Sequence, residues 1–214
     1  MSDFPKFVHF HEEGPREGFQ SEPRIYPLAE RAAFIDALSA TGLKQIQAAS
    51  FVSAKAVPTM ADAEDLFKAI QRRPGVRYTG LWLNEKGFEK ARSVPEVDID
   101  GKLLFYTSDA FSLRNNNRTA RQMRDEQLRW LDMYLAGGYP VENAYIMTAF
   151  GCNLQGEVPL EAVTDCARWV IETFRGRQLP LPRLVIADTT GWGHPEEVKR
   201  LQADGRRVAM IGDG

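Results

Sequence analysis

The sequence has few of the features that mark several large classes of protein. Its only two cysteines, Cys152 and Cys166, form no C-x-x-C pair, which argues against a disulfide framework and against a structural zinc site. The formal net charge of −2 gives no basic field for nucleic acid or for a membrane surface. The sequence has no apolar run of the roughly 20 residues that span a bilayer, and MSDFPKF lacks the regions of a signal peptide. We therefore expect a cytoplasmic protein with small-molecule partners.

The chain does have a repeated alternation of short apolar stretches and longer helix-patterned segments, which is typical of βα units around a parallel sheet. With 214 residues and 43% hydrophobic content, one substantial core is expected, in a single domain over residues 1–214. The predicted strands are 7–11, 44–50, 77–83, 102–108, 142–150 and 183–188, with a candidate seventh at 206–212. The predicted helices lie near 28–41, 61–72, 85–93, 119–135, 160–174 and 195–204. This pattern favours an α/β fold of the TIM-barrel type, (β/α)8, incomplete with six to seven βα units.

Polar side chains follow the end of each predicted strand. In a (β/α)8 barrel the reactive groups lie on the loops after the strands, so these positions are the candidates for a site. They are Arg16, Glu17 and Gln20 after the first strand, Ser50 after the second, Asn84 after the third, Ser108, Asn115 and Asn117 after the fourth, Cys152 after the fifth, and Asp188 with Thr189 after the sixth. Together they predict a polar, acid-containing site assembled from many segments.

Most of these residues also have a purely structural interpretation. Arg16 and Glu17 could form a solvated turn pair. Asp188 could cap the helix near Pro195. The cysteines fit buried small hydrophobes, and Asn115–Asn117 fit a turn. His9 and His11 alternate onto one strand face, where packing is commoner than metal binding, and they are left out of the site.

Six segments resemble hydroxymethylglutaryl-CoA lyases. GPREGFQ is similar to the GPRDGLQ motif that opens those enzymes, ASFVSAKAVPTMAD to their second-strand segment, and DTTGWGHP to their DTxGxGxP segment. Further matches are NEKGFE, the SxxFSxxNxN pattern of Ser108–Asn117, and FGCNLQGEV. The matches run in the family's order from residue 7 to about residue 201, so the resemblance covers most of the chain.

The resemblance implies a metal-dependent carbon–carbon lyase of leucine degradation, with a pyruvate carboxyltransferase-type domain. Such an enzyme cleaves 3-hydroxy-3-methylglutaryl-CoA to acetyl-CoA and acetoacetate. It implies catalytic roles for Arg16, whose guanidinium would stabilise the enolate, and for Asp188. It also implies a divalent cation, Mg²⁺ or Mn²⁺, with Glu17 as ligand where the family has aspartate. The implied substrate-binding residues are Gln20, Ser50, Asn84 and Thr189, and Thr189 could also orient Asp188. The expected partner is an acyl-CoA substrate, and a homo-oligomer is a candidate assembly.

The sequence also departs from the family's pattern. Gln47 stands where the lyases usually carry glutamate, and Met210 and Ile211 stand near the expected His-x-His metal ligands. Gln47 weakens the assignment of the substrate, because a neutral amide cannot take a proton as glutamate can. From the missing histidine ligands we expect a C-terminally shortened chain with weak cation binding and weak or no turnover. A condensing acyltransferase of the isopropylmalate or homocitrate synthase type and a non-enzymatic remnant stay open as alternatives. For a working site, Arg16, Glu17 and Asp188 are expected to converge within about 10 Å.

Overall fold

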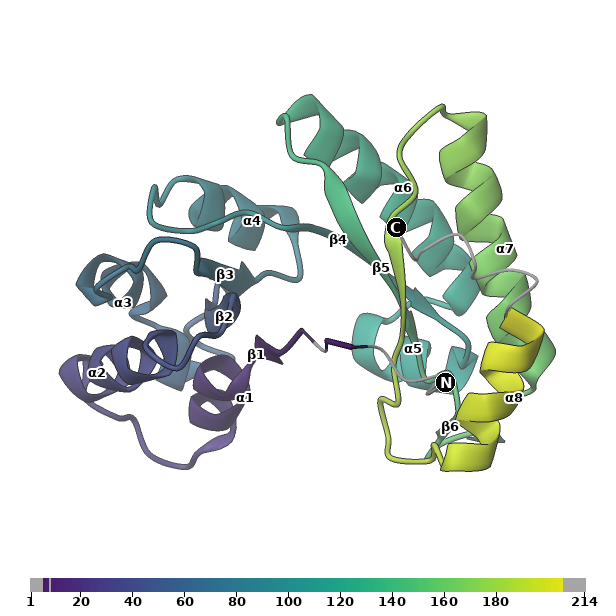
Figure 1. Ribbon diagram of the computed structural model, residues 1–214, viewed down its shortest axis with the longest axis horizontal. Coiled ribbons are helices and arrows are strands. Elements are labelled where there is room, and N and C mark those ends of the chain that lie inside the picture. The colour runs from purple at the N-terminus through teal and green to yellow at the C-terminus, as the bar shows by residue number, and fades with distance from the viewer. Residues whose placement is uncertain (1–5, 8, 206–214) are drawn as a thin grey trace. The chain divides into compact units, whose positions relative to one another are not determined.

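The computed structural model describes residues 6–7 and 9–205 in two compact units, Met1–Ile99 and Asp100–Gly214 (Figure 1). The candidate seventh strand at 206–212, with Met210 and Ile211, lies outside the described residues. Each unit contains a three-stranded sheet whose strands are all parallel. The prediction of one domain over residues 1–214 stays a prediction.

The first unit is built on a parallel sheet of order β1-β2-β3. Its strands are β1 (His11–Glu12), β2 (Gln45–Ser50) and β3 (Arg77–Leu81). Its helices are α1 (Gly14–Ser21), α2 (Leu28–Ser39), α3 (Ala63–Ala69) and α4 (Glu85–Arg92), with the 3-10 helix η1 (Pro58–Met60). Strand β2 is buried from Ile46 to Ser50, as expected for a central parallel strand covered on both faces. Both α1 and α3 pack on β2, so the position of α1 is set by the core.

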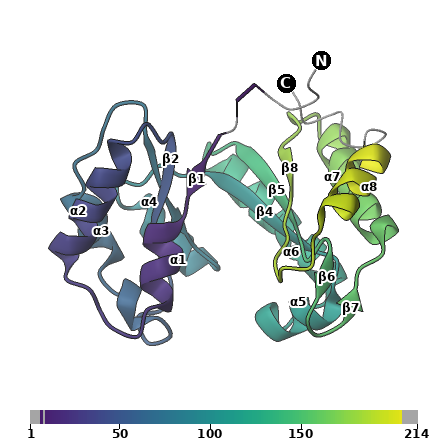
Figure 2. The ribbon, with the colours of Figure 1, turned by 60° about the horizontal axis from the view of Figure 1, so that its bottom comes forward.

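The second unit is built on a parallel sheet of order β4-β5-β8 (Figure 2). Its strands are β4 (Gly101–Tyr106), β5 (Val141–Met147) and β8 (Arg183–Ile186), with a short antiparallel pair, β6 (Gly151–Cys152) and β7 (Gly156–Glu157). Its helices are α5 (Asp109–Asn116), α6 (Ala120–Ala136), α7 (Leu160–Gly176) and α8 (Pro195–Gly205). Helix α6 packs on β4 and α7 on β5, and α6 begins at a capping box formed by Thr119 and Gln122.

The elements agree with the sequence pattern in most of the chain, and the differences lie near the candidate site residues. The predicted first strand at 7–11 is present only as His11–Glu12, with Val8 outside the described residues. The segment after it is helix α1, which begins with a proline in its first turn. Helix α5 was also not predicted, and the Ser108 hydroxyl caps it by accepting from the Phe111 N–H at 3.2 Å. No helix within residues 6–7 and 9–205 is long and apolar enough to cross a membrane.

Candidate active site

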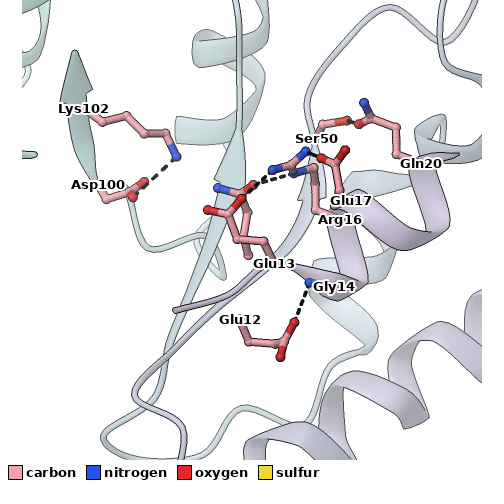
Figure 3. A network of polar contacts seen from close by, with 10 residues as sticks. Glu12, Glu13, Gly14, Arg16, Glu17, Gln20, Ser50, Asp100 and Lys102 are labelled. Carbon is pink, nitrogen blue, oxygen red and sulfur yellow. Dashed lines mark hydrogen bonds and ion pairs between the residues drawn. The ribbon is translucent and has the colours of Figure 1, made fainter. Parts of the chain in front are cut away.

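Arg16 is the centre of the polar cluster in the first unit (Figure 3). Its guanidinium donates from Nε to Gln47 Oε1 at 2.6 Å and from one terminal nitrogen to Glu13 Oε2 at 2.6 Å. The other terminal nitrogen donates to Glu17 Oε2. The Arg16 side chain is only 12% exposed, so this cation is held in one orientation by three partners.

A second side-chain pair ties α1 to β2. The fully buried Ser50 hydroxyl donates to Gln20 Oε1 at 2.8 Å, and the Thr59 hydroxyl donates to the Gln20 carbonyl at 3.5 Å. Together with the Arg16–Gln47 contact, this pair fixes both ends of α1 against the strand. The structure therefore brings together Arg16, Glu17, Gln20 and Ser50 from two segments of the chain, with Gln20 and Ser50 separated by 30 residues in the sequence.

The arrangement around Arg16 can stabilise a developing negative charge. Its five donors are fixed in a planar fork, and preorganised donors lose little energy to reorientation during a reaction. The two carboxylates also neutralise the guanidinium at rest. An anionic ligand that binds Arg16 must therefore share the guanidinium with these carboxylates or displace one of them. Glu17, which is 62% exposed, is easier to displace than Glu13, which is 44% exposed.

Asn84 has a clear local role in the structure. Its side-chain oxygen accepts from the Gly87 N–H at 2.9 Å, so it is the N-cap of α4. The residue is exposed, and its predicted contact with a substrate stays a prediction.

Asp188 organises the loop that follows β8 in the second unit. Its two carboxylate oxygens accept from the Trp192 N–H at 2.9 Å and from the Gly193 N–H at 3.0 Å. Because both donors precede Pro195, where α8 begins, Asp188 folds the loop rather than capping that helix. The Thr189 hydroxyl accepts from the Thr148 N–H at 2.7 Å, just after the end of β5. Its predicted role in orienting Asp188 stays a prediction.

The loop is also attached to the β6–β7 pair, which lies beside it in Figure 2. The Trp192 indole N–H donates to Asn153 Oδ1 at 2.7 Å, and the Thr190 hydroxyl donates to the Gly151 carbonyl at 2.9 Å. The indole covers Gly151 so closely that a side chain there would overlap the ring. The sequence alone does not indicate the contact between Trp192 and Asn153, because that contact depends on the β6–β7 pair, which was not predicted.

The remaining candidates have mainly structural contacts. The Ser108 hydroxyl donates to Gln155 Oε1 at 2.9 Å, and Asn117 ends α5 with a left-handed backbone at φ 54°. Asn115 lies within α5 and is exposed. Both cysteines are free and buried, which agrees with their interpretation as small hydrophobic residues. Burial acts to raise the pKa of the Cys152 thiol, but hydrogen bonds from Ser108 and from the Leu154 and Gln155 N–H groups outweigh it and leave the pKa below its ordinary value.

The described residues do not by themselves fit a complete divalent-cation site. Within residues 6–7 and 9–205 there is no group of three or more His, Cys, Asp or Glu side chains that could hold a metal ion. The predicted ligand Glu17 is bound to Arg16. Because hard cations take six or more oxygen ligands, Glu17 alone is insufficient to hold one.

Glu13 was missed by the sequence reasoning. It lies three residues before Arg16, a spacing that brings side chains together only if the segment is helical. Since α1 was not predicted, that spacing carried no weight. Arg16 and Glu17 belong to the first unit and Asp188 to the second, so their predicted convergence stays a prediction.

Parallel α/β architecture with a fixed arginine is typical of enzymes that bind anions, and comparison with known proteins shows the family. No family model matches the chain. Mouse mitochondrial hydroxymethylglutaryl-CoA lyase is 34% identical over 203 residues, which are 94% of this chain and 59% of the mouse protein. The chicken mitochondrial enzyme is 30% identical over 211 residues, covering 98% of this chain and 67% of its own length.

Solved structures agree with this result. The hydroxymethylglutaryl-CoA lyase of Pseudomonas aeruginosa superposes with a TM-score of 0.82 at 32% identity, covering 97% of this chain and 67% of that one. A lyase of Acinetobacter baumannii, solved with coenzyme A and 3-methylmalate, gives a TM-score of 0.78 at 27% identity, covering 99% and 67%. The chain therefore belongs to the hydroxymethylglutaryl-CoA lyase family, and the predicted TIM-barrel type of fold is confirmed. The chain spans 52–67% of the length of the curated relatives it matches.

Proposed function

We propose that this chain acts as a carbon–carbon lyase that cleaves 3-hydroxy-3-methylglutaryl-CoA to acetyl-CoA and acetoacetate. The observation that carries the proposal is the fixed guanidinium of Arg16, held by Gln47 and two carboxylates at the end of α1 that faces β2. Similarity to relatives named as lyases supports the choice of reaction.

The reaction needs a group of this kind because of where the electrons go. Loss of the proton from the 3-hydroxyl turns that carbon into a ketone, and the bonding pair of the broken C–C bond moves to the acetyl side as an enolate. The enolate oxygen then carries negative charge until its carbon takes up a proton. A guanidinium with preorientated N–H donors stabilises that oxygen, and one donor of this kind is typically worth about 3 kcal/mol.

The other predicted residues enter as proposals with different support. Gln20 and Ser50 form one hydrogen-bonded pair beside Arg16, and we propose that they bind the substrate from α1 and β2. Asp188 is proposed as a catalytic acid or base group, with Thr189 and Asn84 as substrate contacts. The support for Asp188 is its fixed orientation on two backbone N–H groups.

We propose a divalent cation, Mg²⁺ or Mn²⁺, as cofactor, with Glu17 as one oxygen ligand. When bound, such a cation would polarise the substrate's hydroxyl and carboxylate. Because Glu17 is bound to Arg16 and no metal-binding group of three exists in the described part of the chain, we propose that this affinity is weak. An acyl-CoA is the proposed partner and the cytoplasm the proposed location, with assembly into a homo-oligomer as a further proposal.

The test is a product assay on the purified chain. Acetoacetate and acetyl-CoA should appear together from 3-hydroxy-3-methylglutaryl-CoA, and Arg16→Ala should remove about 100-fold of the rate. Condensation of acetyl-CoA with an oxo acid, in place of cleavage, would favour the acyltransferase alternative. An absence of both reactions would favour the non-enzymatic one.

A further inference from the structure

The three partners of Arg16 are not equivalent in charge. The guanidinium is only 12% exposed, and a cation with so little water around it requires a nearby negative charge. Gln47 provides a hydrogen-bonding oxygen at 2.6 Å from Nε but no charge. The neutralising charge must therefore come from the helix itself, from Glu13 or Glu17.

Glu13 is the better placed of these two carboxylates. It lies 2.6 Å from Arg16 and is 44% exposed, whereas Glu17 is 62% exposed and is also the proposed ligand of a cation. A second carboxylate on the guanidinium leaves Glu17 free to change its partner.

The local structure around Glu13 points the same way. Glu13 is the N-cap residue of α1, a position where a side chain usually accepts from the first backbone N–H groups of the helix. It makes no such cap hydrogen bond. The neighbouring Glu12 instead accepts from the Gly14 N–H at 2.6 Å, and Figure 3 shows the two carboxylates turned to these different donors. The side chain of Glu13 therefore serves Arg16 rather than the helix end.

We infer that Glu13 is a positioning residue of the active site, which supplies the negative charge that holds and neutralises Arg16 where Gln47 supplies none. The inference rests on the proposed function only in so far as Arg16 is the catalytic arginine. It also explains how a neutral Gln47 is compatible with a half-buried arginine in this chain. The carboxylate comes from the start of α1 instead of from β2.

If Glu13 has this role, a carboxylate at position 47 should replace the one that is lost from position 13. Glu13→Gln should lower the midpoint of thermal unfolding by about 2–4 °C, the shift expected for a partly exposed ion pair in a chain of this size. Adding Gln47→Glu to that variant should restore the midpoint. In the wild-type background Gln47→Glu should not raise it, because a third carboxylate would then crowd one guanidinium.

Glu12→Gln is the matched control. It removes an equal charge from the same helix end, so it loses the same interaction with the helix dipole, but it does not contact Arg16. Gln47→Glu should therefore fail to rescue Glu12→Gln. If Gln47→Glu rescues both variants or neither, Glu13 has only a general role at the helix end and the inference is wrong.

Turnover gives a second readout that separates the two proposals. In the acetoacetate assay, Glu13→Gln should lower kcat about tenfold with a smaller change in KM, and Gln47→Glu should restore kcat. Turnover without this rescue overturns the role of Glu13 and leaves the proposed function intact. Rescue of the unfolding midpoint in a chain with no turnover overturns the proposed function and, with it, the active-site role of Glu13, and it supports only the neutralisation of Arg16 by Glu13.

Discussion

At the scale of single residues, the chain shows how a buried polar group becomes a fixed part of a site. Ser50 is buried, Arg16 and Gln20 are half-buried, and each has a partner on another segment. A buried polar atom without a partner costs about 1–3 kcal/mol, so these contacts define one arrangement of α1 on β2.

Removing the Ser50 hydroxyl should release Gln20 from β2. We expect Ser50→Ala to lower the free energy of unfolding by about 1 kcal/mol, because the Gln20 side-chain oxygen loses its donor at 2.8 Å. Chemical denaturation measures the change. The exposed Ser53→Ala serves as control, and an equal loss in both variants would mean that the Ser50–Gln20 bond is not what stabilises this contact.

The two thiols should differ in reactivity. Burial raises the pKa of Cys166 to about 11, against weaker opposing effects of Arg124, whereas the pKa of Cys152 lies below its ordinary value because of its hydrogen bonds. The thiolate is the reactive form, and it is only a small fraction of a thiol at a pH well below the pKa. Cys166 should therefore stay almost entirely neutral between pH 7 and about pH 9, and Cys152 should be alkylated first. Mass spectrometry of the native chain treated with iodoacetamide measures this order. Faster labelling of Cys166 would contradict it.

At the scale of elements, the long periodic segments could be predicted and the short ones could not. Helices α6 and α7, each of 17 residues, and the apolar strand β2 have patterns long enough to fix their type. Helix α1 is only eight residues with two glycines, so its pattern is too short to read, and its stability comes from packing on β2. The sequence therefore located Arg16 but not Glu13, whose contact depends on that helix.

The same limit applies to the loop after β8. The motif DTTGWG marked Asp188, but its contacts with Trp192 and Gly193 depend on a loop conformation. That loop is held by the two-residue strands β6 and β7, which are shorter than any pattern could indicate. Tertiary contacts, not local periodicity, decide this part of the site.

Gly151→Ala should detach this loop from the hairpin. A methyl group at Gly151 would overlap the Trp192 ring, so the indole must move and its hydrogen bond to Asn153 must lengthen or break. We expect a red shift of the tryptophan emission, absent when Trp192→Phe is already present, and a lower unfolding midpoint. Gly176→Ala, where nothing lies within 4 Å of the added carbon, is the control. An unchanged emission spectrum would show that Trp192 does not rest on Gly151.

At the scale of the whole molecule, family membership establishes the type of fold but does not establish which ligands this chain binds. The 30% identity over 98% of the chain and the TM-score of 0.82 establish the family and the type of fold. They do not assign a cation, because the described residues include no metal-binding group of three and Glu17 is held by Arg16. Cation affinity is therefore a property to measure on this chain.

Calorimetric titration should show weak binding of Mg²⁺ or Mn²⁺ that depends on Glu17. We expect Glu17→Gln to weaken the affinity further by at least about tenfold, since it removes the charged oxygen ligand, and Glu12→Gln to leave it unchanged. Tight binding that is insensitive to Glu17 would refute the assignment of this ligand.

We propose that Arg16 performs lyase chemistry in this chain, and acetoacetate release from the purified protein measures that activity. Purified protein is incubated with 3-hydroxy-3-methylglutaryl-CoA and added Mg²⁺ or Mn²⁺, and acetoacetate release is compared between the wild type, Arg16→Lys and Arg16→Ala. We predict slow, cation-stimulated release that falls about 100-fold in Arg16→Ala and is only partly retained in Arg16→Lys, because an ammonium lacks the fixed fork of donors. Release that is equal in the wild type and Arg16→Ala, or no release from either, would contradict the claim.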